Sequence, residues 1–287
     1  MLFIVNPKAG NGRALKAVEN IKNICNKIGV NYALEFTSYP ENAVEIANKN
    51  AAKFEKIIAV GGDGTLNEVL NGIVDTNTAL GVLPCGTGND FARTIYKTMD
   101  INKIIELLVK GDYKKCDVGK CLNKHFINIA SVGLDAEIAH KVQRGKKIFG
   151  GKTSYLLQLA NTLIKYKNTS LKIQIDDMSF ESETLLTIIS NGKYYGGGIM
   201  PAPESDIFDG KFDICHIKRM NKLKIPFLLN KYIKGHHKDF KEVSFYRGKK
   251  VKIESEDLFA VNLDGETFLA NEVQFELKSK YVNLIYP

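Results

Sequence analysis

A chain of 287 residues with 44% hydrophobic and 25% charged side chains has the composition of a packed globular protein, which excludes a largely disordered chain. This length suits two modest domains. The longest apolar runs are far shorter than the ~20 residues that cross a bilayer, and the first residues lack the pattern of a secretory signal. We therefore expect a cytoplasmic protein.

The net charge of +8 is concentrated in one segment. Residues 218–252 contain twelve Lys or Arg against Asp239 and Glu242, a local net of +10, so the rest of the chain is near −2. A concentrated basic segment is typical of a polyanionic partner, either nucleic acid or anionic lipid headgroups. A merely solvated basic face is the alternative.

The first part of the chain alternates short apolar runs with amphipathic stretches. This order of strand, helix and strand predicts a parallel, doubly wound α/β sheet. The predicted strands are residues 2–5, 32–36, 56–60 and 80–83, and the predicted helices are residues 14–28, 41–54 and 66–73.

After about residue 117 the chain carries short runs rich in β-branched and aromatic residues, separated by turn residues. This pattern predicts a mainly antiparallel β-sandwich, and we place two domains at residues 1–118 and 119–287. The predicted strands are residues 126–131, 170–175, 183–190, 212–217, 250–254, 259–263, 272–277 and 281–286, with helices at 153–167 and about 224–234.

A glycine-rich loop follows the predicted strand 56–60 and reads Gly61-Gly62-Asp63-Gly64-Thr65. Its glycines let the backbone approach a ligand closely, and the helix that follows offers unpaired N–H groups to an anion. The loop therefore predicts a phosphate cradle, in which Asp63 would hold a Mg²⁺ directly or through water. The alternative is a tight turn with Asp63 as the helix cap.

Two more glycine-rich loops follow neighbouring predicted strands, at residues 6–13 and 84–90. The first carries Lys8 and Arg13, which can contact phosphates. Ligands bind at the carboxyl ends of strands in open α/β sheets, so three such loops together favour a phosphate site. None of them matches the P-loop pattern or the dinucleotide-binding pattern.

The motifs of these three loops resemble, in order and spacing, the signature of the diacylglycerol kinase catalytic-domain family. That family includes bacterial diacylglycerol kinases, phosphatidylglycerol-phosphorylating relatives, sphingosine kinases and ceramide kinases. The resemblance covers essentially the whole chain and is specific for the family, not for the substrate. The matching motifs are Asn6-Pro7-x-x-Gly10, Gly61-Gly62-Asp63-Gly64-Thr65 with Asn67-Glu68, and Gly86-Thr87-Gly88-Asn89-Asp90-Phe91-Ala92-Arg93.

The resemblance implies a lipid kinase that transfers the γ-phosphoryl group of ATP to a lipid hydroxyl with the help of Mg²⁺. Diacylglycerol is the leading substrate; phosphatidylglycerol, a sphingoid base or a polyprenol are alternatives. ATP would bind between an N-terminal, NAD kinase-like α/β domain and a C-terminal β-sandwich domain. The nucleotide-contacting positions would be Asn6, Gly10, Thr37, Gly61, Gly62, Asp63, Gly64, Thr65, Gly86, Thr87 and Asn89.

The resemblance also implies two Mg²⁺ sites. Asp63, Asp90 and Asp117 match carboxylates that organise water around an active-site Mg²⁺. A second, structural Mg²⁺ would be held by the Asp209 carboxylate, with Asp206 and the carbonyl of Lys211 completing the set. An Asp-Gly turn between strands is the alternative reading of this loop.

The sequence Asp264-Gly265-Glu266 resembles the family's D-G-E motif. Read alone, it is a hairpin turn with an Asp-Gly signal. Beside the phosphate loops, Glu266 would serve as the general base that takes the proton from the acceptor hydroxyl. Asp264 is the nearest competitor, and would orient Glu266 or serve the metal.

Basic and apolar residues are mixed in residues 140–167 and again in residues 218–252, which suits docking to an anionic bilayer. Core packing is the alternative for the apolar residues. We expect a peripheral membrane protein whose partners are a lipid substrate and an anionic membrane surface, without nucleic acid, and we leave a homodimer open. The rival hypotheses are an NAD kinase, which shares the G-G-D-G motif, and a non-catalytic membrane-binding relative.

Overall fold

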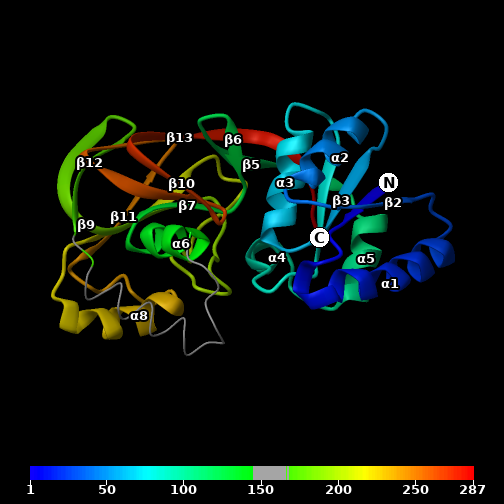
Figure 1. The fold of residues 1–287 in the computed structure, drawn as a ribbon, viewed down its shortest axis with the longest axis horizontal. Helices are drawn as coiled ribbons and strands as arrows, with labels where there is room; N and C mark the ends of the chain where they lie inside the picture. The colour runs from blue at the N-terminus through cyan, green and yellow to red at the C-terminus, as the bar shows by residue number, and fades with distance from the viewer. Residues whose placement is uncertain (145–165, 167) are drawn as a thin grey trace.

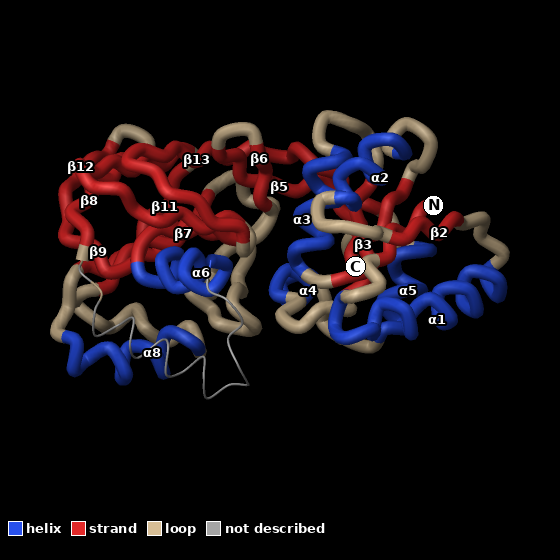
Figure 2. The backbone as a smooth tube through the Cα atoms, viewed as in Figure 1, coloured by secondary structure: helices blue, strands red, loops and turns tan. Residues whose placement is uncertain are grey.

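The computed structural model describes residues 1–144, 166 and 168–287. Figure 1 shows two parts side by side, with both chain termini in the same part. One part surrounds its strands with helices, and the other is built mainly from strands with helices α6 and α8 beside them (Figure 2). The predicted helix 153–167, and the basic stretch that overlaps it, lie almost entirely outside the described residues.

The N-terminal part contains the predicted parallel sheet. Strand β1 pairs with β2 and β3, and β3 pairs with β4, all in parallel. The strands are nearly continuous apolar runs because helices cover both faces of such a sheet. The strands are β1 (Leu2–Val5), β2 (Ala33–Phe36), β3 (Lys56–Gly61) and β4 (Ala79–Pro84), and the helices are η1 (Ala9–Gly12), α1 (Arg13–Ile28), α2 (Asn42–Asn50), α3 (Asp63–Ile73), α4 (Asp90–Ile95) and α5 (Ile101–Lys110).

The C-terminal part is antiparallel, as predicted. Strand β9 pairs with β7, β8 and β10, and β12 pairs with β7, β8 and β13. Within the described ranges, no helix is both long and apolar enough to cross a membrane. The strands are β5 (Tyr113–Cys121), β6 (Lys124–Phe126), β7 (Ile129–Gly133), β8 (Thr169–Ile175), β9 (Met178–Ser190), β10 (Phe212–Lys218), β11 (Val243–Gly248), β12 (Lys250–Leu263) and β13 (Glu266–Ile285), and the helices are α6 (Leu134–Arg144), η2 (Lys222–Lys224) and α8 (Ile225–Ile233).

Two long strands replace four short predicted ones. The pairs 250–254 with 259–263, and 272–277 with 281–286, are the single strands β12 and β13. Each strand continues through a shift of register, between Glu254 and Phe259 in one and between Lys278 and Val282 in the other. The polar residues that signalled turns in the sequence therefore form irregularities within continuous strands.

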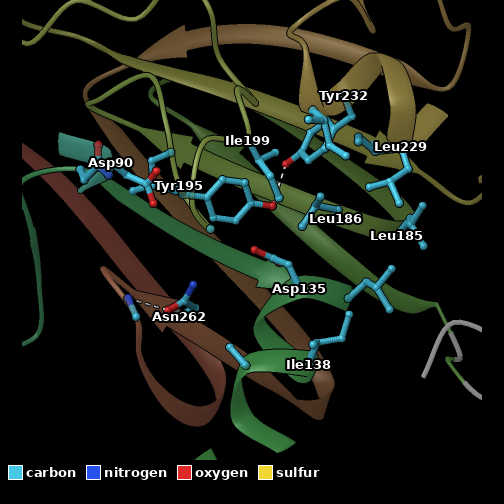
Figure 3. A pocket seen from close by; sticks show the side chains of 18 of the residues that line it. Asp90, Asp135, Ile138, Leu185, Leu186, Tyr195, Ile199, Leu229, Tyr232 and Asn262 are labelled. Atoms are coloured by element: carbon cyan, nitrogen blue, oxygen red, sulfur yellow. Dashed lines mark hydrogen bonds between the residues drawn. The ribbon is translucent and has the colours of Figure 1, made fainter. Parts of the chain in front are cut away.

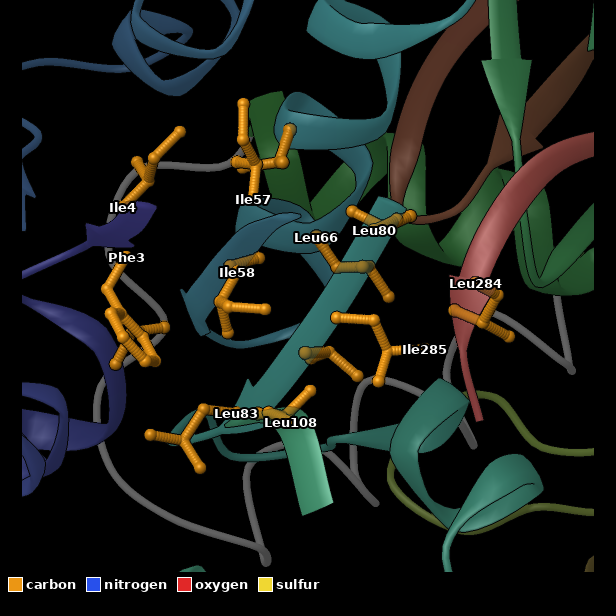
Figure 4. Close-up of a cluster of buried hydrophobic side chains, with 14 of the residues drawn as sticks. Phe3, Ile4, Ile57, Ile58, Leu66, Leu80, Leu83, Leu108, Leu284 and Ile285 are labelled. Atoms are coloured by element: carbon orange, nitrogen blue, oxygen red, sulfur yellow. The ribbon is translucent and has the colours of Figure 1, made fainter. Parts of the chain in front are cut away.

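The last strand joins the two parts of the chain. Asn283 and Leu284 of β13 pair in parallel with Ala79 and Leu80 of β4, so one sheet runs through both parts. Leu284 and its neighbour Ile285 lie in the N-terminal core with side chains of β1, β3 and β4 (Figure 4). The first 118 residues therefore complete their core with the end of the chain, while the predicted domain limits stay a prediction.

Replacing Leu284 by alanine should lower the free energy of unfolding by about 2–5 kcal/mol, because it opens a cavity in this core. Urea denaturation followed by circular dichroism measures the change. The control is Leu258→Ala, at a side chain that is 66% exposed, and it should change stability by no more than about 0.5 kcal/mol. Equal effects of the two substitutions would show that β13 does not stabilise the N-terminal part.

Candidate functional site

The three glycine-rich loops meet at the carboxyl edge of the parallel sheet. The side-chain amide of Asn6, after β1, donates a hydrogen bond to the Thr65 hydroxyl, after β3, at 3.1 Å. The backbone N–H groups of Cys85 and Gly86, after β4, donate to the Gly61 carbonyl at 2.7 and 3.0 Å. The structure thus brings together residues that the sequence placed in one phosphate site.

Glycine is required where these loops touch. A Cβ atom on Gly86 would lie 2.3 Å from the Cα of Gly62, and one on Gly10 would lie 2.0 Å from the Cys85 carbonyl oxygen. Gly10 also has a φ of +58°, a conformation that favours glycine. The loops therefore present bare backbone beside the N-terminus of α3, which is the chemistry that binds phosphate groups.

The predicted nucleotide residues outside the G-G-D-G loop lie at the same edge. The backbone N–H of Thr37 donates to the Val5 carbonyl at 2.9 Å, just after β2. Asn89 braces the third loop, since it accepts from the Gly86 N–H at 2.8 Å and donates to the Gly86 carbonyl at 2.9 Å. Thr87 and Asn89 line a cavity of about 440 Å³ that also receives three cationic side chains, those of Arg13, Lys16 and Arg93.

Asp63 and Asp90 flank the same glycine. A Cβ atom on Gly88 would lie 3.1 Å from a carboxylate oxygen of each. Asp63 accepts from the Phe91 N–H at 3.0 Å, and Asp90 accepts from the Gly197 N–H at 2.8 Å. The other oxygen of Asp90 is buried and has no hydrogen-bond partner.

Burial above all, with the Asp63 charge as a further cause, raises the pKa of Asp90. A cation beside the two carboxylates would relieve both the burial cost and the repulsion. Carboxylate oxygens are also the ligands that Mg²⁺ prefers. Asp63 and Asp90 therefore fit the predicted Mg²⁺ site.

Asp117 contacts the loop at residues 206–210. Its two carboxylate oxygens accept from the backbone N–H groups of Gly210 and Lys280, at 2.7 Å each. Burial is the largest cause that raises its pKa, and Asp209 and Asp206 are the nearby charges that contribute. The structure thus places Asp117 against the 206–210 loop, and its role at the active-site Mg²⁺ stays a prediction.

The loop predicted to hold a structural Mg²⁺ makes its own contacts. Asp206 accepts from the Phe208 N–H and Asp209 from the Lys211 N–H, both at 3.0 Å. Asp209 also forms an ion pair with Arg247. Across residues 1–144, 166 and 168–287, no three acidic, His or Cys side chains are grouped as a ready metal site. Both Mg²⁺ sites therefore stay predictions.

Asp264 connects the two parts of the chain. Its carboxylate accepts from the backbone N–H groups of Ile127 and Ile129 at 2.8 Å, with Asn128 at 3.2 Å, and from the Asn67 amide of α3 at 3.0 Å. Burial raises its pKa to about 6 although these donors oppose the shift. A carboxylate that accepts four hydrogen bonds is suited to hold the 264–266 turn beside α3. This geometry favours the orienting role for Asp264.

Glu266 lies at the rim of the contact between the two parts. Its side chain is 47% exposed and forms an ion pair with Lys124, whose ammonium also lies 3.8 Å from Glu41 of the N-terminal part. Glu266 itself does not line the apolar cavity described next, although Asp264 and Gly265 do. Its assignment as the general base stays a prediction.

An apolar cavity of about 490 Å³ leads away from the phosphate loops into the C-terminal part (Figure 3). Asp90 lies at one end of the lining in Figure 3, Asp63 and Asp264 belong to the same lining, and the walls come from α6, β9, α8 and the loop around Tyr195. The sequence did not reveal this cavity, because its lining cannot be told from ordinary core residues. The apolar lining includes Leu134, Ile138, Val142, Leu185, Leu186, Ile199, Ile217, Leu228, Leu229 and Ile233.

An acidic side chain that was not predicted from the sequence lies in this cavity. Asp135 of α6 points into the apolar space between α6 and the loop of Tyr195 (Figure 3). Both of its carboxylate oxygens are buried without a hydrogen bond of normal geometry. Burial raises the pKa of Asp135 to about 6, an effect that the hydroxyl of Ser131 moderates. The signal in the sequence was an acidic residue two positions after the apolar strand at 129–133.

Comparison with known proteins gives the same outline. Residues 1–121 match the family described as the diacylglycerol kinase catalytic domain, and residues 128–286 match the YegS C-terminal NAD kinase beta sandwich-like domain. A diacylglycerol kinase of Bacillus subtilis is 30% identical over 92% of this chain and 88% of its own length. The diacylglycerol kinase of Staphylococcus carnosus is 29% identical over 92% of this chain and 87% of its own length.

Solved structures agree with this result. The crystal structure of a diacylglycerol kinase from Bacillus anthracis covers all of this chain and 96% of its own, with a TM-score of 0.79 and 26% identity. The two matched domains and the likeness over both of them define a lipid kinase of two parts. The chain belongs to the diacylglycerol kinase family.

The unsubstituted protein should lose unfolding free energy as pH rises and Asp135 ionises, and replacing Asp135 by asparagine should remove this loss. The pKa of about 6 in the folded protein lies above the ordinary value of 3.8, so the folded state favours the protonated acid. The contribution of Asp135 to the unfolding free energy is therefore intact below about pH 4 and falls by roughly 3 kcal/mol as pH rises through 6.

Urea unfolding of both proteins at about pH 4.5 and about pH 8 tests this expectation, because one pH lies below the shifted pKa of Asp135 and the other lies above it. The variant should gain stability relative to the unsubstituted protein at the higher pH. A difference between the two proteins that is the same at both pH values would contradict the assignment.

Proposed function

We propose that this protein transfers the γ-phosphoryl group of ATP to the hydroxyl of a membrane lipid, with diacylglycerol as the leading substrate. The observation that carries the proposal is the apolar cavity that ends at Asp63, Asp90 and Asp264. A hydroxyl at that end would lie beside the phosphate loops while its acyl chains occupy the apolar interior. Ligand cavities of this size bury most of a small molecule's surface.

The glycine-rich loops support ATP as the phosphoryl donor. Their backbone N–H groups and the N-terminus of α3 favour a polyphosphate, and Arg13, Lys16 and Arg93 add positive charge nearby. Asp63 and Asp90 would hold Mg²⁺, which supplies charge neutralisation on the phosphates when bound. Phosphoryl transfer depends mainly on such positioning and charge stabilisation, so few further groups are needed.

Glu266 would accept the proton of the lipid hydroxyl. Asp264 holds the turn that carries Glu266, and the pair with Lys124 fixes the direction of the Glu266 side chain. A carboxylate that accepts the proton as the new P–O bond forms makes the hydroxyl a better nucleophile.

The lipid hypothesis explains the cavity better than the NAD kinase hypothesis. A dinucleotide acceptor carries many polar groups, whereas most of the residues that line the cavity are apolar. A non-catalytic relative would have no need for two adjacent carboxylates, Asp63 and Asp90, at the glycine-rich loops. The test is transfer of radiolabelled phosphate from ATP to diacylglycerol, phosphatidylglycerol, sphingosine, ceramide, undecaprenol and NAD, each supplied separately. Labelling of NAD alone would contradict the proposal, as would the absence of any labelled product.

Asp63→Asn should lower turnover by roughly 10²-fold or more, because a neutral amide loses charge stabilisation worth several kcal/mol in a metal-assisted transfer. The amide oxygen still accepts from the Phe91 N–H, so the melting temperature should change little. Asp177→Asn, in the exposed turn between β8 and β9, is the matched control. Near-normal turnover of Asp63→Asn at saturating Mg²⁺ would remove Asp63 from the mechanism.

Glu266→Gln should lower turnover by roughly 10² to 10⁴ with little change in the affinity for Mg-ATP, because it removes the base and keeps the shape. Asp264→Asn should instead lower stability by about 1–3 kcal/mol, since an amide N–H₂ would face backbone donors. Kinetics and urea denaturation on both variants separate the roles. If Asp264→Asn loses turnover at full stability while Glu266→Gln stays active, Asp264 is the base.

A further inference from the structure

Helix α8 has apolar side chains on two opposite sides. On one side Ile225, Leu228 and Tyr232 are buried against the C-terminal part. On the other side Phe227 is 73% exposed, and Leu223, one turn earlier in η2, is 80% exposed. A surface helix normally needs only the buried stripe, so a second, exposed pair at a spacing of four residues indicates a surface that binds something.

Basic side chains surround this exposed pair. Residues 218–241 contain eight Lys or Arg and one acidic residue, Asp239. A groove beside η2 is lined by Lys218, Arg219, Lys222, Lys224 and Lys241, with Glu183 and Glu242 as its acidic members. Glu183 is paired with Arg219 and Glu242 with Lys224.

Exposed apolar residues set among lysines are typical of a helix that lies in the interface of an anionic bilayer. A net charge of +8 also opposes the stacking of two copies of this chain through the same basic face. The charge pattern therefore selects an anionic membrane surface over a second copy. Two basic residues after 241 have their charge offset by two acids each, since Arg247 pairs with Asp209 and Asp213, and Lys252 with Glu254 and Glu272.

The same helix forms a wall of the apolar cavity. Leu229, Tyr232 and Ile233 line it from α8, opposite Asp135 and Ile138 of α6 (Figure 3). Ile233 is also 41% exposed, so the lining reaches the protein surface at the end of α8. A lipid that enters here would move from the bilayer toward Asp63 and Asp90 without exposing its acyl chains to water.

We propose that η2 and α8 dock on an anionic bilayer by inserting Leu223 and Phe227, so that a lipid enters the cavity at α8. This inference rests on the proposed lipid kinase function for its second half, whereas the docking itself does not. Leu223 and Phe227 lie outside the cavity lining, so their replacement leaves the site near Asp63 and Asp90 intact.

The test compares the double variant Leu223→Ser, Phe227→Ser with the matched control Leu122→Ser, Leu258→Ser, whose side chains are 68% and 66% exposed in the β5–β6 turn and in β12. Sedimentation with phosphatidylserine–phosphatidylcholine vesicles at low salt, without ATP, measures binding. The first variant should bind at least roughly tenfold more weakly, as expected from the loss of two inserted apolar side chains. The control should bind as the unsubstituted protein does, and salt should weaken its binding.

Two further measurements complete the design. Phosphorylation of a short-chain diacylglycerol dissolved as monomers should be unchanged in the double variant, while phosphorylation of long-chain diacylglycerol in vesicles should fall with binding. Equal vesicle binding by all three proteins would overturn the docking inference, as would binding that neutral phosphatidylcholine vesicles support equally well. A dimer that only the double variant dissociates, seen by analytical ultracentrifugation, would instead assign the surface to a second copy. If vesicle binding behaves as expected but no lipid is phosphorylated, the docking surface stands and the kinase proposal fails.

Discussion

The buried carboxylate of Asp264 is the interaction on which the arrangement of this molecule depends. It accepts hydrogen bonds from three successive backbone N–H groups of the C-terminal part and from the Asn67 amide of the N-terminal part. These bonds hold the backbone between β6 and β7 against the turn that carries Glu266. Because α3 also begins at Asp63, the same helix ties the phosphate loops to the cavity that Asp264 helps to close.

A second constraint is the contact of bare backbone between loops. Gly62 and Gly86 approach so closely that no side chain fits between them, which leaves N–H groups and two carboxylates at the sheet edge. Beside this polar edge the C-terminal part provides an apolar cavity. In the proposed function the polar edge would hold a polyphosphate and the apolar cavity would hold a lipid, which suits a kinase whose two substrates differ in their solubility.

The features that could be predicted from the sequence are those determined by residues close together along the chain. Strand, glycine loop and helix follow one another along the chain, so the three glycine-rich loops and the sheet edge at which they meet were predicted. Helix α5 was not predicted, although the sequence carried a signal for it. That signal is the N-cap residue Asp100, which accepts from the N–H groups of Asn102 and Lys103. The splitting of β12 and β13 was wrong because polar residues at a register shift resemble a turn.

Features set by long-range contacts could not be found in this way. The partners of Asp117 come from Gly210 and Lys280, far along the chain, so its grouping with the 206–210 loop had no local signal. The cavity is likewise assembled from α6, β9 and α8, whose apolar residues look like core residues in sequence. Asp135 is an exception among the residues of the cavity. An acidic residue that closely follows an apolar strand is a local signal, so Asp135 could have been singled out from the sequence.

The central claim is that the apolar cavity holds the lipid whose hydroxyl is phosphorylated. Ala139 of α6 lines the cavity, and Ala139→Phe would partly fill it while leaving the phosphate loops untouched. The most direct measurement is radiolabelled phosphate transfer to long-chain diacylglycerol by this variant, with Mg-ATP binding followed by calorimetry. We expect transfer to fall at least roughly tenfold, since the acyl chains lose their place, with unchanged nucleotide affinity. Full transfer by a folded variant with a filled cavity would contradict the account.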